Sequence, residues 1–176
     1  ATSQVGGVVL FARNIESPAQ VARLNAQLQA AAPSGQPLFV GVDQEGGRVQ
    51  RLREPMTRWP PMARLGQLDD VHLTEAVGEA MGRDLAALGF NLDFAPVLDV
   101  VSSPDNTVIG DRSFGADPEL VSRHGIALAQ GLLKAGILPC GKHFPGHGGP
   151  VADSHLTLPL ERRSLAQITE LDLVPF

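Results

Sequence analysis

Residues 37–43 read PLFVGVD, a short run of apolar, β-branched and aromatic residues that ends in an aspartate. A Pro-Ser-Gly turn leads into this run, whose composition is typical of a strand buried on both faces of a sheet. The segment before it has the complementary pattern. An apolar run at 6–12 is followed by helical periodicity that starts at Ser17-Pro18, an expected N-cap with proline at the first helical position. A strand, a helix and a second strand therefore form the first unit of the chain.

The same order continues toward the C-terminus. Helical periodicity at 72–88 ends at Gly89, a strand is expected at 90–100, and a helix at 118–135 closes at Gly136. A fourth strand is expected at 137–144, and a fourth helix begins near 161–164. The helix at 72–88 is expected to bury an apolar stripe made of Leu73, Ala76, Val77, Ala80, Met81 and Leu85. This alternation predicts a parallel sheet with right-handed crossovers, either doubly wound or a (β/α)₈ barrel.

The composition limits the kinds of partner. The chain has 176 residues, of which 43% are hydrophobic and 19% charged, as in a globular protein, and no linker marks a second domain, so 1–176 is expected to be one domain portion. The formal net charge of −5 argues against nucleic-acid binding. A lone Cys140 allows no intrachain disulfide, and no apolar run has the length of a membrane span. We therefore expect a cytoplasmic protein with a small-molecule ligand and no membrane partner.

Chemically active residues gather where the predicted strands end. Asp43, Asp99 and the pair Lys142-His143 each follow a strand and precede a long loop. In both parallel architectures the carboxyl ends of the strands share one rim, and ligands bind at that rim. These residues are therefore candidates for a common site.

Two loops on this rim carry forked cationic donors. In DQEGGRVQRL (43–52), Gly46-Gly47 lacks the context of a nucleotide-binding loop and is expected to be an ordinary turn, whereas Asp43 and Arg51 can hold sugar hydroxyls and carbonyls. In NTVIGDRSFG (106–115), Asp111-Arg112 is compatible with a surface ion pair, but its position on the rim favours contact with a ligand.

The stretch KHFPGHGGPVADSH (142–155) contains the densest set of titratable groups. One interpretation is a metal site formed by His143, His147 and His155, although the spacing matches no helical zinc motif and Lys142 would repel the metal. The other is acid/base catalysis, in which a carboxylate orients an imidazole through an Asp-x-His arrangement.

Several of these motifs, taken in order, resemble one enzyme family. GVDQEGGRVQRL, IGDRSFG and KHFPGHG followed by DSH are similar to the family 3 glycoside hydrolases, specifically the bacterial β-N-acetylhexosaminidases of peptidoglycan recycling. The resemblance spans nearly the whole chain. It implies a (β/α)₈ barrel of the TIM type, of which this chain would supply roughly the first half, and a retaining mechanism without a metal or cofactor.

The resemblance also implies roles for individual residues. His155 would be the general acid/base and Asp153 its dyad partner in the removal of β-linked N-acetylglucosamine from muropeptides. The residues expected to hold the sugar are Asp43, Arg51, Arg112, Lys142 and His143. The aspartate nucleophile would lie beyond the end of this chain. Asp99 is better explained by structural packing or by a hydrogen bond at the strand end. A metal-dependent hydrolase and a sugar-binding fragment without catalysis stay open as alternatives.

The chain departs from the family pattern in the loop that carries the acid/base residues. The family usually reads KHFPGHGDT where this sequence reads KHFPGHGGP, so Gly149 and Pro150 replace an acid and a hydroxyl residue. We therefore expect the acid/base loop to be held differently from that of the family.

Overall fold

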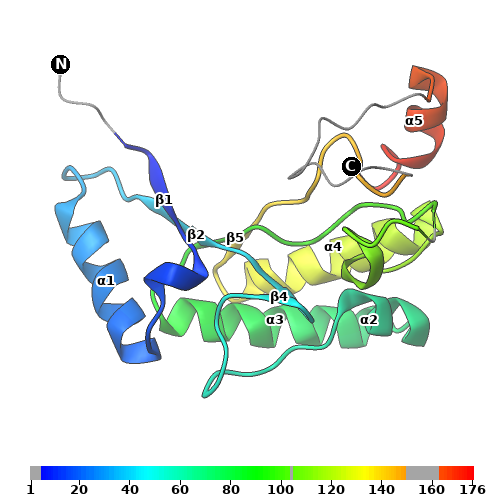
Figure 1. The fold of residues 1–176 in the computed structure, drawn as a ribbon. Helices are drawn as coiled ribbons and strands as arrows, with labels where there is room; N and C mark the ends of the chain where they lie inside the picture. Colours follow the sequence, from blue (N-terminus) through cyan, green and yellow to red (C-terminus); the bar gives the residue numbers. More distant parts are fainter. Residues whose placement is uncertain (1–4, 104, 150–162) are drawn as a thin grey trace.

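The computed structural model describes residues 5–103, 105–149 and 163–176 (Figure 1). At its centre lies a four-stranded parallel sheet made of β1 (Gly7–Leu10), β2 (Phe39–Val42), β5 (Leu92–Asp93) and β6 (Leu138–Pro139). The strands are neighbours in the order in which they occur along the chain. Sequential order is the arrangement of a (β/α)₈ barrel, whereas a doubly wound sheet reverses its order at a switch point.

Helices make the connections between these strands, as the sequence predicts. They are α1 (Pro18–Ala31), α2 (Met62–Leu68), α3 (Val71–Ala87) and α4 (Pro118–Lys134), with single 3₁₀ turns at Ala12–Asn14 (η1) and Gly110–Arg112 (η2). A further helix, α5 (Leu165–Leu171), follows β6. The Ser17 hydroxyl caps α1 by accepting from the backbone N–H of Gln20, and Asp70 caps α3 in the same way. None of the helices in the described ranges combines the length and the apolar character needed to cross a membrane.

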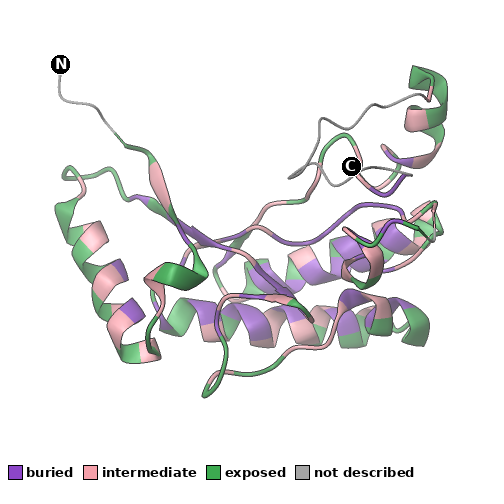
Figure 2. Cartoon of the chain, viewed as in Figure 1, coloured by how far each residue is buried: buried purple, intermediate pink, exposed green. Residues whose placement is uncertain are grey.

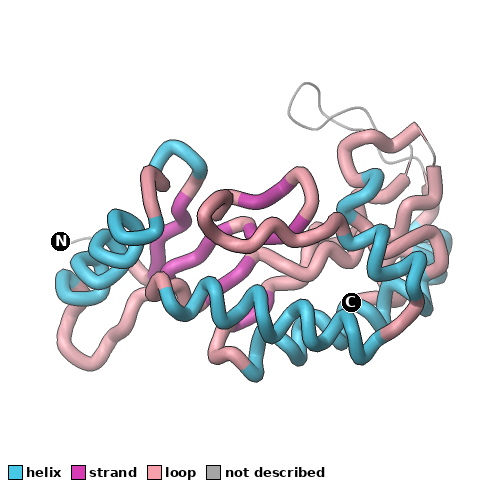
Figure 3. The backbone as a smooth tube through the Cα atoms, turned by 90° about the horizontal axis from the view of Figure 1, so that it is seen from below, coloured by secondary structure: helices cyan, strands magenta, loops and turns pink. Residues whose placement is uncertain are grey.

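The core lies between the sheet and the helices, which is where Figure 2 shows most of the buried residues. Leu10, Val40 and Val42 point from β1 and β2 toward it, and the helices contribute Leu85, Leu128 and Leu132 among others. Seen from below, the strands lie side by side, with α1 at one end and α3 and α4 running together along the sheet (Figure 3). The helices cover a face of the sheet, and the rim at the carboxyl ends of the strands is formed by the loops that follow them.

The buried face of α3 differs from the predicted apolar stripe. Met81 and Leu85 are buried as expected, but Leu73 is 40% exposed. The helix instead buries Thr74, Gly78 and Gly82. A side-chain carbon at Gly78 would lie 2.5 Å from the carbonyl oxygen of Leu128, so the two helices meet backbone to backbone. Close helix contact selects small residues, which a count of apolar side chains does not detect.

The strands are shorter than predicted, and two elements were not predicted. The expected strand at 90–100 pairs as β5 over Leu92–Asp93, and pairing resumes at a single bridge between Val97 and Lys142. Pro96 lies between β5 and this bridge, where it has no N–H to donate to a ladder. The residues after β2 form a small antiparallel hairpin of β3 (Gln44–Gly46) and β4 (Val49–Gln50), and α2 lies in the connection that follows.

Candidate active site

Lys142 is the centre of a charged cluster at the carboxyl ends of the strands. Its ammonium group lies 2.7 Å from Oδ1 of Asp43, which follows β2, and 2.6 Å from Oε1 of Glu45 on β3. The Lys142 side chain is 13% exposed and that of Glu45 is 1% exposed, so this cation sits between two largely desolvated carboxylates. The β3–β4 hairpin brings Glu45 into this position, with Gly46 and Gly47 at positive φ in its turn.

Arg112 holds the other side of Glu45. Its Nε and one terminal nitrogen donate to the two carboxylate oxygens at 2.8 and 2.9 Å, the bidentate geometry that suits guanidinium and carboxylate. Burial lowers the pKa of Arg112, but its bonds to Glu45 and the nearby carboxylates outweigh that effect and raise the pKa above its ordinary value. Arg112 therefore keeps its positive charge in the site.

Asp43 stays ionised for a related reason. Its partial burial raises the pKa of the carboxyl group, but the hydrogen bond and charge of Lys142, with a weaker contribution from Arg51 at 3.3 Å, bring the pKa below its ordinary value. The site thus presents charged acceptors and charged donors side by side.

His143 is oriented by Asp99. The fully buried carboxylate of Asp99 lies 2.6 Å from Nδ1 of His143, and its other oxygen accepts from the backbone N–H of His143 and of His147. Nδ1 therefore carries the proton, and Nε2 is left to accept from Arg112 at 3.2 Å. Asp99 serves as a structural hydrogen-bond acceptor, in agreement with its interpretation from the sequence.

These groups surround a cavity of about 440 Å³. Its lining consists of Asp43, Glu45, Val49, Arg51, Val108, Arg112, Lys142, His143 and His147. The volume lies within the range of roughly 300–1,000 Å³ that is usual for small-molecule sites. Donors and acceptors at this density suit a ligand that has hydroxyl and carbonyl groups on several sides, as a sugar has.

The structure brings together the five residues that the sequence predicts to hold the sugar, while Asp153 and His155 lie outside the described residues. Glu45 is a charged residue of the site that was not predicted from the sequence, where only the neighbouring Gly46-Gly47 turn was interpreted. Its place two residues after Asp43 in an extended segment was the available signal. Asp111 does not line the cavity and forms an exposed ion pair with Arg48 at 3.0 Å.

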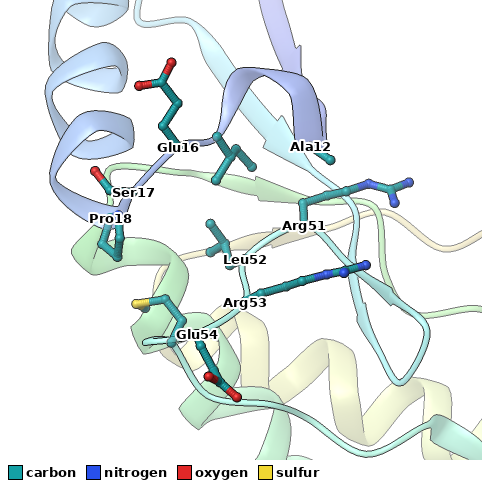
Figure 4. A pocket seen from close by; sticks show the side chains of 10 residues that line it. Ala12, Glu16, Ser17, Pro18, Arg51, Leu52, Arg53 and Glu54 are labelled. Carbon is teal, nitrogen blue, oxygen red and sulfur yellow. The ribbon is translucent and has the colours of Figure 1, made fainter.

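A second cavity, of about 300 Å³, lies beside the first between the N-terminus of α1 and the loop after β4. Arg51 borders both cavities. In Figure 4 the guanidinium groups of Arg51 and Arg53 extend to the same side, away from Glu16, Ser17 and Pro18. The charged end of Arg51 thus belongs to the first cavity, where it meets Asp43.

Comparison with known proteins shows which family this chain resembles. The chain is 47% identical, over 98% of its length and 49% of the relative, to a protein of Thiobacillus denitrificans named beta-hexosaminidase. It is 44% identical to NagZ from Neisseria gonorrhoeae in complex with N-trifluoroacetyl-D-glucosamine, with a TM-score of 0.89 over 97% of this chain and 51% of the other. For the same enzyme in complex with zinc ion, identity is 42% and the TM-score 0.87, over the same shares of the two chains.

The chain thus spans about half the length of the curated relatives that it matches. The family model for the glycosyl hydrolase family 3 N-terminal domain, whose fold is a TIM-type α/β barrel, matches residues 1–176. The sequence motifs, the sequential parallel sheet and this match agree, and the chain belongs to glycosyl hydrolase family 3.

Proposed function

We propose that this chain is the sugar-binding half of a retaining β-N-acetylhexosaminidase. The observation that carries the proposal is Lys142 held between Asp43 and Glu45, with Arg51, Arg112 and His143 around the same cavity. Carboxylates accept from sugar hydroxyls, and the cations donate to hydroxyl and carbonyl oxygens. A relative with the same fold binds an N-acylated glucosamine, which supports N-acetylglucosamine as the sugar.

The proposed chemistry proceeds in two steps. His155, oriented by Asp153, protonates the leaving oxygen while an aspartate beyond this chain attacks the anomeric carbon, and His155 then activates the water that releases the sugar. Asp43, Arg51, Arg112, Lys142 and His143 hold the sugar during both steps. The chain's own contribution is thus the binding site and the acid/base group.

We further propose that the substrates are peptidoglycan-derived muropeptides with a terminal β-linked N-acetylglucosamine, and that the enzyme acts in the cytoplasm. The motif resemblance to enzymes of peptidoglycan recycling supports the substrate class. The single cysteine supports a reducing compartment.

Hydrolysis of aryl glycosides tests the proposal. The full-length enzyme should release the aryl group from a β-N-acetylglucosaminide far faster than from the corresponding β-glucoside, which lacks the acetamido group. The 176-residue chain alone should bind N-acetylglucosamine without turnover. Equal rates on both glycosides would contradict the assignment, and binding without turnover by the full-length protein would favour a sugar-binding function.

One observation favours the alternative of a metal-dependent hydrolase: a relative has been solved in complex with zinc ion. Both ring nitrogens of His143 are already engaged, by Asp99 and Arg112, so zinc ligation would require these contacts to break. Dialysis of the full-length enzyme against a chelator should therefore leave its hydrolysis rate unchanged. Loss of activity, with recovery on adding zinc, would establish the metal-dependent alternative.

A further inference from the structure

Asp99 is a fully buried carboxylate whose two oxygens have different partners. Oδ1 accepts from the backbone N–H of His147 at 2.6 Å and from that of His143 at 3.3 Å. Oδ2 lies 2.6 Å from Nδ1 of the His143 ring. Because the two backbone donors both lie at Oδ1, Oδ2 is the oxygen that faces the imidazole, and it can only accept a proton from the ring.

The second ring nitrogen of His143 faces a group that can only donate. Nε2 lies 3.2 Å from a terminal nitrogen of Arg112, and a guanidinium carries five N–H donors and no acceptor. This contact therefore requires a lone pair on Nε2, which a ring with its proton on Nδ1 provides. The contacts of the imidazole with Asp99 and with Arg112 thus demand the same tautomer.

The bond to His143 also completes a nearly full set of bonds around Arg112. Nε and one N–H of Nη2 donate to the carboxylate of Glu45, the other N–H of Nη2 donates to His143, and Nη1 donates to the carbonyl of Val108 at 3.1 Å. Among the described residues, this leaves the second N–H of Nη1 without a partner. Arg112 is thus held by its neighbours and keeps one donor for a ligand in the cavity that it lines.

We propose that Asp99 is a positioning residue for sugar binding, in addition to making its structural bonds to the backbone. Its carboxylate keeps the proton of His143 on Nδ1, so that Nε2 remains the acceptor that holds Arg112. Arg112 in turn presents its remaining N–H to an oxygen of the sugar. The inference rests on the proposed function, because it acts through a residue that holds the sugar.

Asp99→Asn inverts the tautomer with little change of shape. The backbone N–H groups of His143 and His147 require an acceptor, so the amide oxygen replaces Oδ1 and the amide nitrogen faces Nδ1. The ring proton then moves to Nε2, where it opposes an N–H of Arg112. In the full-length enzyme, the inhibition constant of N-acetylglucosamine and the KM for an aryl β-N-acetylglucosaminide should each rise at least about tenfold, the scale of one hydrogen bond to a charged group. The kcat should change less than about threefold, because the lost bond serves ground state and transition state alike.

His143→Ala separates positioning from the other effects of Asp99. Without the ring there is no tautomer for Asp99 to select, although the backbone bonds and the charge of Asp99 remain. In this background, Asp99→Asn should change the inhibition constant of N-acetylglucosamine by less than about threefold. A further loss of about tenfold would show that Asp99 acts through the backbone or through its charge, and would overturn the proposal.

The tautomer itself can be observed by NMR of the full-length enzyme with isotope-labelled histidine nitrogens. The signals of the His143 ring, assigned by their loss in His143→Ala, should show a proton on Nδ1 and none on Nε2. In Asp99→Asn the proton should be on Nε2. A proton on Nε2 in the unsubstituted enzyme would overturn the proposal, and this measurement does not depend on whether Asp99→Asn folds.

Asp69→Asn is the matched control. Asp69 also pairs with a buried imidazole, because its Oδ1 lies 3.1 Å from Nε2 of His124, but it is located at the C-terminus of α2. Neither residue is part of the cavity lining. The substitution should therefore leave the inhibition constant, KM and kcat unchanged within about twofold.

The outcomes distinguish this inference from the function on which it depends. If the unsubstituted enzyme neither cleaves the aryl glycoside nor binds N-acetylglucosamine, the proposed function fails. If it does both, but Asp99→Asn lowers kcat alone or leaves the inhibition constant unchanged, the positioning proposal is overturned and the function stands.

Discussion

Among single residues, Asp93 is unusual because its carboxyl group is buried with only part of its hydrogen-bonding capacity used. Its carboxyl group is fully buried, with one oxygen accepting from the N–H of Gln44 and the other without a partner among the described residues. Burial raises the pKa of Asp93 well above its ordinary value, and the bond from Gln44 and the charge of Lys142 offset only part of that effect. The folded protein therefore retains a proton that the unfolded chain releases near pH 4.

This linkage predicts that Asp93→Asn stabilises the protein, and more so at higher pH. As pH rises above the ordinary pKa of Asp, the unfolded chain binds fewer protons than the folded one, so the free energy of unfolding of the unsubstituted protein falls. An asparagine at position 93 does not titrate, so it contributes no pH dependence to the free energy of unfolding. Urea unfolding should show a larger gain in the free energy of unfolding at pH 8 than at pH 5, because the unsubstituted protein loses this linked stability as the pH rises. The exposed Asp105→Asn should give parallel curves, and parallel curves for Asp93→Asn would refute the argument.

Glu45 makes the opposite kind of contribution, because it neutralises Lys142 and Arg112 in a desolvated position. Glu45→Gln should lower the free energy of unfolding by about 3–5 kcal/mol, the usual effect of breaking a buried ion pair from one side. If the protein stays folded, its affinity for N-acetylglucosamine should fall because both cations lose their orientation. Calorimetric titration measures this, and the exposed Glu170→Gln should change neither quantity. An unchanged affinity would show that Glu45 does not organise the binding groups.

At the scale of elements, helix positions could be predicted more easily than the contacts they make. Ser17 marks the start of α1 through a local bond, and apolar periodicity that ends at Gly89 marks α3, so both helices were predicted from the sequence alone. The buried face of α3 was not, because Thr74 and Gly78 are buried for reasons that lie in α4. Thr74 bonds to the buried ring of His124 at 2.8 Å, a contact between residues fifty positions apart. In the site, too, local patterns could be predicted and contacts between distant segments could not. The motifs at strand ends were predicted, whereas Glu45, which a hairpin brings to Lys142, was not.

The crossing of α3 and α4 gives a prediction that runs against helix propensity. Alanine is favoured over glycine in a helix by about 1 kcal/mol, yet a side-chain carbon at Gly131 would overlap the backbone of Glu75 and Glu79. Gly131→Ala should therefore lower the melting temperature, by several degrees if the overlap costs a few kcal/mol. Gln130→Ala, exposed on the same helix, should have almost no effect. A rise in melting temperature for Gly131→Ala would mean that the helices can separate without cost.

At the scale of the whole molecule, the sheet has one face against the helices and a second face that is partly exposed. Val9, Gly41, Leu92 and Leu138 are register partners across the four strands, and Val9 and Leu138 at the two outer strands are 40% and 44% exposed. Phe39, two residues before Gly41 and so on the same face, is 52% exposed. In a closed barrel this face is interior and the outer strands are paired.

We therefore expect the 176-residue chain on its own to associate through this face and its unpaired outer strands. Light scattering over a dilution series should show species larger than the 18.6 kDa monomer, together with binding of a hydrophobic dye. A Leu138→Lys variant should weaken both signals, because a charge on an outer strand opposes pairing with a second copy. Lys substitution of Leu68, which is 60% exposed at the end of α2 and outside the sheet, is the matched control and should alter neither. A monomer at all concentrations without dye binding would show that the chain covers this face by itself, and the half-barrel would then be a stable unit in its own right.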